Sequence, residues 1–483
     1  MKHTNYYLVL LFLTIAGPLS ATYFGNGLKI GEVDQDSAII WTRLTRDAEF
    51  NMQGHMWIDY EIPSERTDSS GRSRVEHASR MPNGATLNDM AFSLPGAAGE
   101  VRLIYWPDND TSKIVEKDWI QVDVNKDHTL QILIDGLKPN TEYDVVLASR
   151  NLEGSLRASV TGQFKTAPKS NTVEEVTFTV VTCHDFGRRD NLINGHRIYP
   201  SMARIVKPDF IVHAGDIEYY DKADPWARSA ELARHKWNRI FALPYQVDFY
   251  RQFASYFIKD DHDTLKNDAW PGESYGDLTW EQGLAIYREQ VPIGEKTYRT
   301  RRWGKDLQIW MVEGRDFRSP NNMPDGPGKT IWGEEQKAWL FNSMEKSDAS
   351  FKILISPTPI VGPDRGSKND NHANEGFTWE GDQVREFLST QDNAFVLCGD
   401  RHWQYATVHP ETGVREFSAG AGSDMHAGGF KDSQRTEAHK FLRIDGGFLS
   451  VSVNRKGGTP QVTFTHYDID GNPVNAETFA SEK

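Results

Sequence analysis

The strongest constraint on the fold is a pattern that recurs six times after residue 174, in which a short apolar run ends abruptly in charged or metal-ligating residues. Amphipathic stretches of helical character separate the runs, and strands alternating with helices predict an α/β layer structure. In open α/β sheets, ligands collect beyond the carboxyl ends of the strands. Six such ends at one edge therefore predict a single catalytic rim. The polar ends are residues 182–185, 213–216, 259–263, 313–316, 356–359 and 398–402.

The first third of the chain has a different character. Residues 37–44, 56–62 and 101–106 are rich in β-branched and aromatic side chains, with turn-formers between them. Residues 137–143 end in Tyr143 and precede an alternating strand, which is typical of an immunoglobulin- or fibronectin-like sandwich with a corner tyrosine. We therefore predict an all-β N-terminal domain at residues 22–168, then a polar break, and an α/β catalytic domain at residues 175–478.

Composition limits the partners that the chain can bind. A chain of 483 residues is too long for one ordinary hydrophobic core, so more than one domain is expected. Its formal net charge is -14. Such an acidic protein is poorly suited to bind nucleic acid over a broad surface. A small phosphate remains a possible ligand if metal ions supply local positive charge.

The N-terminus has the features of a signal peptide at residues 1–21. Lys2 and His3 precede an apolar run at 6–15, and small residues at 17–21 form a cleavage region, so the mature chain is expected to begin near Thr22. An uncleaved anchor is the alternative. No later segment has about 18 consecutive apolar residues, so no transmembrane segment is expected in the mature chain. We expect an exported protein that is periplasmic, secreted or attached to the cell surface.

Several of the polar ends contain donors suited to a pair of metal ions. Two cations a few Å apart require one carboxylate that bridges them and further O, N or S donors on rigid strand ends. The glycines before Asp216 and Asp400 permit the tight turns that direct each carboxylate inward. The ordered set is Cys183, Gly215-Asp216-x-x-Tyr219, Asp260-Asp261-His262-Asp263 and Gly399-Asp400-Arg401-His402.

This order of motifs resembles the calcineurin-like metallophosphoesterases. Cysteine in the first motif, DDHD at 260–263 and GDRH at 399–402 together resemble the alkaline phosphatase D (PhoD-like) branch, and GDxxY resembles the purple acid phosphatases. The resemblance covers nearly the whole mature chain. It implies an α/β fold with four layers, an α/β/β/α metallophosphatase sandwich, after the all-β domain. It also implies hydrolysis of a small phosphoric ester, either a monoester or a diester.

The resemblance further implies a ligand set. One metal, ferric iron, is held by Cys183, Asp216, Tyr219 and His402. The second metal, Ca²⁺ or another divalent cation, shares Asp216 and adds Asp261 and Asp400. That second site lacks a donor, for which His372 is the candidate; the alternative is that His372 is an ordinary surface histidine.

The expected mechanism follows from these ligands. A metal-bound hydroxide attacks phosphorus in line, and Arg315 stabilises the charge on the phosphoryl oxygens. His262, oriented by Asp263, protonates the leaving alkoxide or binds the phosphate. Arg315 is equally interpretable as a structural ion-pair partner.

Other interpretations stay open at this point. Asp185 is a minor alternative ligand to Cys183, and Tyr220 competes with Tyr219 for one role, although the GDxxY spacing selects Tyr219. Cys398 is expected in the core, and a disulfide between it and Cys183 would remove a ligand. The same metal centre suits a sulfate ester, and a degenerate fold would serve only as a binding module.

Overall fold

Two large β-sheets dominate the structure, a computed structural model that describes residues 22–67, 73–108 and 110–481. The first sheet has nine strands, in the order β25 (Pro473–Ala480), β24 (Thr459–Tyr467), β23 (Phe448–Lys456), β11 (Val176–Val181), β12 (Phe210–Ala214), β13 (Ala254–Ile258), β1 (Leu28–Gly31), β2 (Ala38–Arg43) and β8 (Thr129–Ile134). The second has seven, in the order β16 (Arg299–Trp303), β17 (Leu307–Met311), β18 (Phe351–Ser356), β19 (Ala394–Cys398), β21 (Arg415–Ala419), β20 (Gln404–Val408) and β22 (His439–Arg443).

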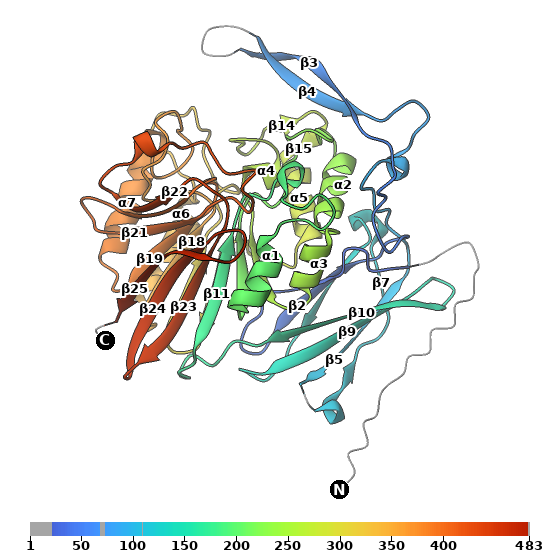
Figure 1. Cartoon of the computed structure of the whole chain (residues 1–483), viewed down its shortest axis with the longest axis horizontal. Helices are drawn as coiled ribbons and strands as arrows, with labels where there is room; N and C mark the ends of the chain where they lie inside the picture. Colours follow the sequence, from blue (N-terminus) through green and yellow to red (C-terminus); the bar gives the residue numbers. More distant parts are fainter. Residues whose placement is uncertain (1–21, 68–72, 109, 482–483) are drawn as a thin grey trace.

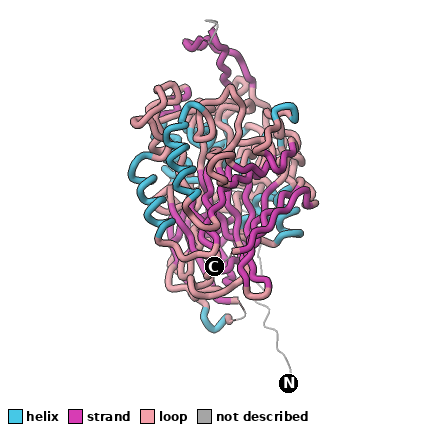
Figure 2. Tube along the Cα trace, turned by 90° about the vertical axis from the view of Figure 1, so that its left-hand side faces the viewer, coloured by secondary structure: helices cyan, strands magenta, loops and turns pink. Residues whose placement is uncertain are grey.

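Helices lie on the outer faces of these two sheets (Figures 1 and 2). They are α1 (Ile198–Ser201), α2 (Ala230–Ile240), α3 (Pro244–Tyr250), α4 (Asp261–Thr264), α5 (Trp280–Gln290), α6 (Gly333–Glu345) and α7 (Thr378–Ser389). The local sequence explains α2 well. The Ser229 side chain accepts the N–H of Leu232 at its start, and Ala233, Trp237 and Ile240 form one buried face.

Alternating side chains within each strand separate the layers. In β12, Phe210 and Val212 join the core between the two sheets, whereas Ile211 packs with the helices of the first sheet. In β18, Ile353 joins the central core and Leu354 packs under α6 and α7. Because successive strand residues face opposite sides, each sheet packs against the other sheet on one face and against helices on its other face. This confirms the predicted four-layer α/β/β/α sandwich.

Parallel pairing brings the predicted polar ends together. β11, β12 and β13 are parallel neighbours in the nine-stranded sheet, and β17, β18 and β19 are parallel neighbours in the seven-stranded sheet. The six runs are therefore divided between two sheets and do not line one edge of a single sheet. Their carboxyl ends still meet, because the two sheets pack face to face.

The predicted N-terminal β-sandwich is also confirmed. A five-stranded sheet contains β10 (Leu156–Lys165), β9 (Glu142–Arg150), β5 (Glu100–Pro107), β6 (Val115–Glu116) and β7 (Ile120–Gln121). Its core residues pack with those of β1, β2 and β8, and β1 pairs in parallel with β13. The sandwich therefore shares a sheet with the catalytic part. Tyr143 acts as the expected corner residue, since its hydroxyl accepts the N–H of Lys138 at 2.9 Å.

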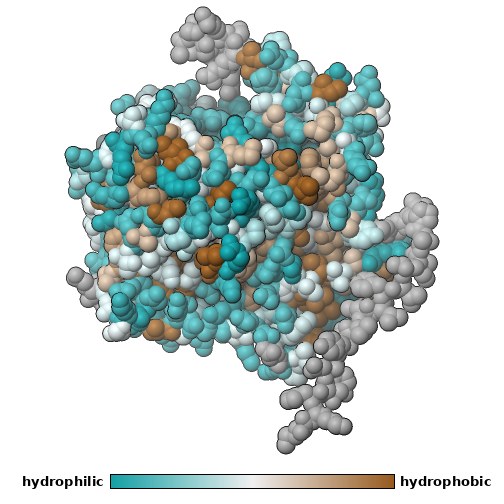
Figure 3. Space-filling model, viewed as in Figure 1, coloured by the Kyte–Doolittle hydropathy of each residue, from teal (hydrophilic) through white to brown (hydrophobic). Residues whose placement is uncertain are grey.

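Two short hairpins complete the strands of the described ranges: β3 (Ile58–Thr67) with β4 (Ser73–Arg80), and β14 (Ser274–Tyr275) with β15 (Leu278–Thr279). The β3–β4 hairpin projects from the body at the top of Figure 1, and His77 stacks on Trp226 at 4.8 Å between ring centroids. The face in Figure 3 is mostly hydrophilic, with apolar residues in small groups. Within the described residues, no helix combines the length and apolar character needed to span a membrane. The predicted signal peptide at residues 1–21 lies outside the described residues.

Candidate metal centre

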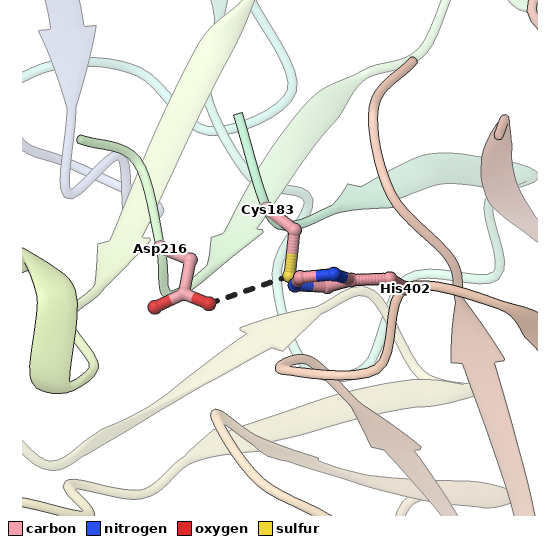
Figure 4. A group of neighbouring side chains, drawn as sticks. All are labelled: Cys183, Asp216 and His402. Atoms are coloured by element: carbon pink, nitrogen blue, oxygen red, sulfur yellow. Dashed lines mark hydrogen bonds between the residues drawn. The ribbon is translucent and has the colours of Figure 1, made fainter. Parts of the chain in front are cut away.

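Potential metal ligands from three strand ends and one loop lie close together. Cys183 follows β11, Asp216 follows β12 and His402 follows β19; their donor atoms all lie within 4.8 Å of one another. Figure 4 shows the sulfur of Cys183 between the carboxylate of Asp216 and the imidazole of His402. The Cys183 thiol donates to Asp216 Oδ2 at 3.4 Å, and the Tyr219 hydroxyl donates to the same oxygen at 3.1 Å.

Asp216 also belongs to two further groups of this kind. It lies with Asp261 and His262 in one, and with Asp260 and Asp400 in another. Its Oδ1 is buried and has no hydrogen-bond partner within the described part of the chain. Asp216 is therefore the residue common to all three groups that the structure brings together.

The backbone at these positions is held in an unusual conformation. Cys183, Asp216 and Asp400 have φ angles of 57°, 55° and 61°, in the left-handed region that L side chains seldom adopt. Such residues cost on the order of 1–3 kcal/mol each and cluster at functional sites. Gly399 is required for steric reasons, because a Cβ there would approach the Ala214 carbonyl oxygen to 1.9 Å.

The electrostatics show why the cluster favours cations. Burial, with the nearby Asp261 and Asp400, outweighs His262 and raises the pKa of Asp216 to about 7. Burial and the Asp216 carboxylate likewise raise the pKa of Cys183 well above its usual value. Both groups therefore hold a proton more readily than they do in water, and bound cations would replace those protons. The donor types, the unpartnered Asp216 oxygen and the mutual repulsion of the carboxylates all fit bound metal ions.

His262 lies beside this cluster, but Asp263 does not orient it as predicted. The His262 Nδ1 donates to Asp221 Oδ1 at 2.5 Å, whereas Asp263 accepts the backbone N–H groups of Ile217 and Glu218. Burial opposes a charged imidazole, yet Asp221, Asp261 and Asp216 outweigh it and raise the pKa of His262 to about 10. Asp221, five residues beyond Asp216 in the sequence, is the orienting group that sequence reasoning missed.

Arg315 is placed behind the carboxylates. Its fully buried guanidinium bonds to Asp260, lies 3.7 Å from Asp261 and donates to the Ala269 carbonyl. This matches the alternative in which Arg315 is a structural ion-pair partner. The Asp261 pKa is lowered, because Arg315 and His262 outweigh the effect of burial.

The structure does not bring His372 into the cluster. The ring is fully buried, its Nε2 bonds to Glu380 of α7 at 2.9 Å, and it packs against Trp332 at 4.6 Å between centroids. The three metal-ligand groups found among the described residues do not include it. The prediction that His372 would lie near Asp261 and Asp400 was motivated by its place in a polar loop. The nearby Glu380 carboxylate and apolar packing direct the ring elsewhere.

The remaining alternatives are resolved by contacts. The Tyr220 hydroxyl accepts the indole N–H of Trp237, so Tyr219 is the tyrosine in the cluster. Asp185 accepts the N–H of Gly187 and stays outside the three groups. Both cysteines are free, and Cys398 lies in an apolar cluster with Trp403, Tyr405 and Phe430.

A second missed residue, His426, lies in a glycine-rich loop after β21. Its ring is 4.1 Å from that of His402 and 5.2 Å from that of Tyr219, between centroids. Burial lowers the pKa of His426 to about 4. No sequence pattern indicates it, because a histidine 24 residues beyond His402 belongs to none of the ordered motifs.

Fold and cluster together define a metallophosphoesterase, and comparisons with known proteins give the family. The family described as PhoD-like phosphatase matches residues 178–466, and its N-terminal domain matches residues 15–168. The chain belongs to the PhoD-like phosphatase family, as its motifs predicted, and it is a phosphoric ester hydrolase of that class.

Individual relatives agree with this assignment. Alkaline phosphatase D of Bacillus subtilis (strain 168) is 22% identical over 489 residues, which cover 89% of this chain and 74% of that protein. The solved structure of PhoD has a TM-score of 0.70 at 18% identity, covering 96% of this chain and 92% of that one. Purple acid phosphatase PPD1 from yellow lupin (Lupinus luteus) seeds has a TM-score of 0.63 at 13% identity, covering 94% and 74%. At these identities the two structures show a common fold.

Proposed function

We propose that the protein is an exported two-metal hydrolase of small phosphoric esters, with Asp216 as the carboxylate shared by both cations. The observation that carries the proposal is the membership of Asp216 in all three ligand groups, with a buried oxygen that has no partner among the described residues. A carboxylate in that position has one oxygen for each of two cations.

The donor types suggest which cation each site holds. Cys183, Tyr219 and His402 supply sulfur, phenol oxygen and nitrogen beside Asp216, a set that suits a transition metal such as ferric iron. Asp261, Asp260 and Asp400 supply carboxylate oxygens on the other side. Because His372 lies elsewhere and His262 is assigned to proton donation, the donors left for this second set are oxygens only. Calcium takes oxygen ligands, so we assign it to the second site.

The chemistry of the chain follows from the placement of these residues. When bound, the cations supply positive charge that acidifies a water molecule and stabilises the phosphoryl oxygens. Asp216 and Tyr219 form the buried side of the first site, since they are 0% and 1% exposed, whereas His402 is partly exposed. His262, fixed through Nδ1 by Asp221, presents its Nε2–H to the leaving oxygen and donates the proton that the alcohol requires.

Arg315 has a supporting role in this proposal. It neutralises part of the negative charge of Asp260 and Asp261 and fixes the orientation of both carboxylates. Its burial behind them separates it from a substrate that approaches from solvent. It therefore acts on the reaction through those two residues.

Export and domain limits belong to the same proposal. The apolar run at 6–15 and the small residues at 17–21 support removal of residues 1–21, which leaves a sandwich at 22–168 and a catalytic domain at 175–478. N-terminal sequencing of protein from its native host should give Thr22 or a neighbouring residue. A chain that still begins at Met1 would contradict export by cleavage.

A substrate panel tests the proposed activity. Protein reconstituted with iron and calcium should hydrolyse chromogenic phosphate monoesters, diesters or both, and should leave a matched sulfate ester intact. The metal-free protein is the control. Turnover confined to the sulfate ester, or absent from every ester with both metals bound, would refute the proposal.

A further inference from the structure

His426 is a buried histidine that the two-metal arrangement does not use. It lies in the loop between β21 and β22, and only 2% of its surface is exposed. Its Nε2 has no hydrogen-bond partner within the described ranges. A buried polar atom without a partner beside a reaction site indicates a group that is completed by a ligand.

The loop holds His426 in a fixed position. The His426 Nδ1 lies 3.1 Å from the backbone oxygen of Cys183, and the Gly422 N–H donates to that same oxygen at 3.4 Å. Further along, the Gly428 N–H donates to the His402 carbonyl at 3.0 Å. Two of the three segments that carry proposed ligands of the first metal, those of Cys183 and His402, are thus bonded to the His426 loop. The ring has little freedom to turn away.

The aromatic neighbours of His426 place it on the wall of the site. Its ring contacts those of His402 and Tyr219, and Tyr219 in turn lies 4.2 Å from His262 between centroids. Four rings therefore line one side of the cluster without a break. His262 and His426 stand on either side of Tyr219 in this wall.

The hydrogen bond of Nδ1 fixes which nitrogen carries the proton. A backbone carbonyl only accepts, so Nδ1 must donate to Cys183. Among the described residues neither ring nitrogen is hydrogen-bonded to a carboxylate that would hold the charged form. A neutral imidazole with a proton on Nδ1 has its lone pair on Nε2. His426 thus offers an acceptor to the site, whereas His262 offers a donor.

We propose that His426 is a further catalytic residue, whose Nε2 accepts a hydrogen bond from the oxygen that attacks phosphorus. This inference rests on the proposed function. The bond from that oxygen to phosphorus forms while the bond from phosphorus to the alcohol oxygen breaks. His262 donates its own proton to the alcohol oxygen and regains one from solvent, while the water gives up one of its two protons to solvent. The other stays on the attacking oxygen and becomes the P–OH hydrogen of the hydrogen phosphate product, held throughout by His426 without transfer.

Two substitutions separate this role from a structural one. In His426→Asn the amide nitrogen takes the place of Nδ1, which keeps the donor to Cys183 and removes the acceptor. In His426→Gln the longer amide takes the place of Nε2, which keeps an acceptor and removes the donor. His466→Gln is the matched control, since His466 is another buried histidine outside the metal centre, and its Nε2 bonds to the backbone carbonyl of Ser418, a bond that the longer amide keeps.

Binding of inorganic phosphate provides a readout that does not depend on turnover. Calorimetric titration of the iron- and calcium-loaded proteins should show about tenfold weaker phosphate binding for His426→Asn than for wild type, the effect of one hydrogen bond. His426→Gln should bind phosphate within about threefold of wild type, and His466→Gln should bind it as tightly as wild type. Metal analysis should show full iron and calcium in His426→Asn.

If His426→Gln bound phosphate more weakly than His426→Asn, His426 would act only by supporting Cys183. In that case His426→Gln would lose metal and phosphate affinity, while His426→Asn would keep both. Equal phosphate affinities in the two variants would also overturn the inference, and the proposed function would stand if wild type still hydrolysed esters. A metal-loaded wild type that neither bound phosphate nor hydrolysed any ester would refute the function itself, and this inference with it.

Discussion

Charge is buried in two different ways along the nine-stranded sheet. At the carboxyl ends of β11, β12 and β13, several carboxylates lie together with a thiol and a phenol. On the neighbouring strand β1, Lys29 is 1% exposed, with its Nζ 3.1 Å from the Trp41 ring centroid and 3.8 Å from that of Phe241. That amine has no hydrogen-bond partner among the described residues.

The two regions resolve the problem of buried charge by different means. The carboxylate cluster attracts ligands of opposite charge, so its stability depends on the cations that it binds. The Lys29 amine contacts the rings of Trp41 and Phe241 and is repelled by Arg43, so it can avoid the cost of burying its charge by losing its proton. The difference predicts that the metal centre responds to chelators and mutations of its ligands, whereas the Lys29 pocket responds to pH.

The largest expected effect comes from Asp216→Asn, which changes charge but hardly shape. Loss of the shared carboxylate should reduce kcat/KM by at least about 100-fold, the order seen when one electrostatic contact to a transition state is removed. Steady-state kinetics and metal analysis would check this. Circular dichroism should show an intact fold, because a neutral amide avoids the burial penalty and the repulsion by Asp261 and Asp400 that raise the Asp216 pKa. An active variant would exclude Asp216 as the shared ligand.

Chelation should have the next largest effect. Removal of metal should lower the free energy of unfolding by about 3 kcal/mol for each site saturated 100-fold over its Kd. Thermal unfolding with and without a chelator measures the change, and readdition of iron and calcium should restore the melting temperature. Asp216→Asn should respond much less to chelator than wild type. Equal responses would show that the ions bind elsewhere.

Tyr219→Phe tests the first metal by colour. A ferric ion bound by phenolate and thiolate should give a visible charge-transfer band, which this variant should lose or shift, with about tenfold weaker iron retention from one lost contact. Absorption spectroscopy and iron analysis measure both. Tyr220→Phe is the matched control, since its hydroxyl bonds to Trp237. Identical spectra for wild type and Tyr219→Phe would remove the tyrosine from the iron site.

Lys29→Met should have the smallest effect, and it should raise the free energy of unfolding, whereas chelation lowers it. Burial, with Arg43, lowers the Lys29 pKa well below 10.5, so the unfolded chain binds the proton more readily than the folded one. The lysine therefore destabilises the fold at neutral pH, and this penalty shrinks as pH rises toward 10.5. Lys29→Met should raise the free energy of unfolding by about 1 kcal/mol or more at pH 7.

Chemical denaturation of wild type and Lys29→Met across the alkaline range would test that prediction. The stability difference between them should narrow with rising pH, while phosphatase activity stays unchanged. A constant difference would show that Lys29 is not a buried titrating amine. A Lys29→Met variant less stable than wild type at every pH would show that the contact of the ammonium with Trp41 outweighs its desolvation.

The sequence predicted most of the layers and most of the cluster. Apolar runs that alternate with amphipathic segments are enough to indicate layers of strands covered by layers of helices. Tyr143 and the residues before it are enough to indicate the N-terminal sandwich. Cys183, Asp216, Tyr219 and His402 were predictable because each follows a strand end at a fixed short distance. When few residues separate a side chain from the end of its strand, the strand largely determines where that side chain lies.

Residues on long loops were not predictable in this way. His372 lies 16 residues beyond the end of β18, and packing against Trp332 and Glu380 decides its direction. Asp221 and His426 are likewise placed by contacts with His262 and Cys183, which are distant in sequence. Contacts between residues that are distant in sequence leave no local sequence pattern, so the spacing of residues along the chain does not predict them.

The sequence by itself therefore determined the fold class, the family and four residues of the cluster, because hydrophobic periodicity and short spacings from strand ends are local properties. Tertiary structure alone decided that the sandwich shares a sheet with the catalytic layers, that Asp221 orients His262 and that His426 packs against His402 and Tyr219. It also decided that Arg315 supports Asp260 and that His372 stays out of the metal centre. These outcomes depend on which distant segments pack together, and that packing is set by the free energy of the whole chain.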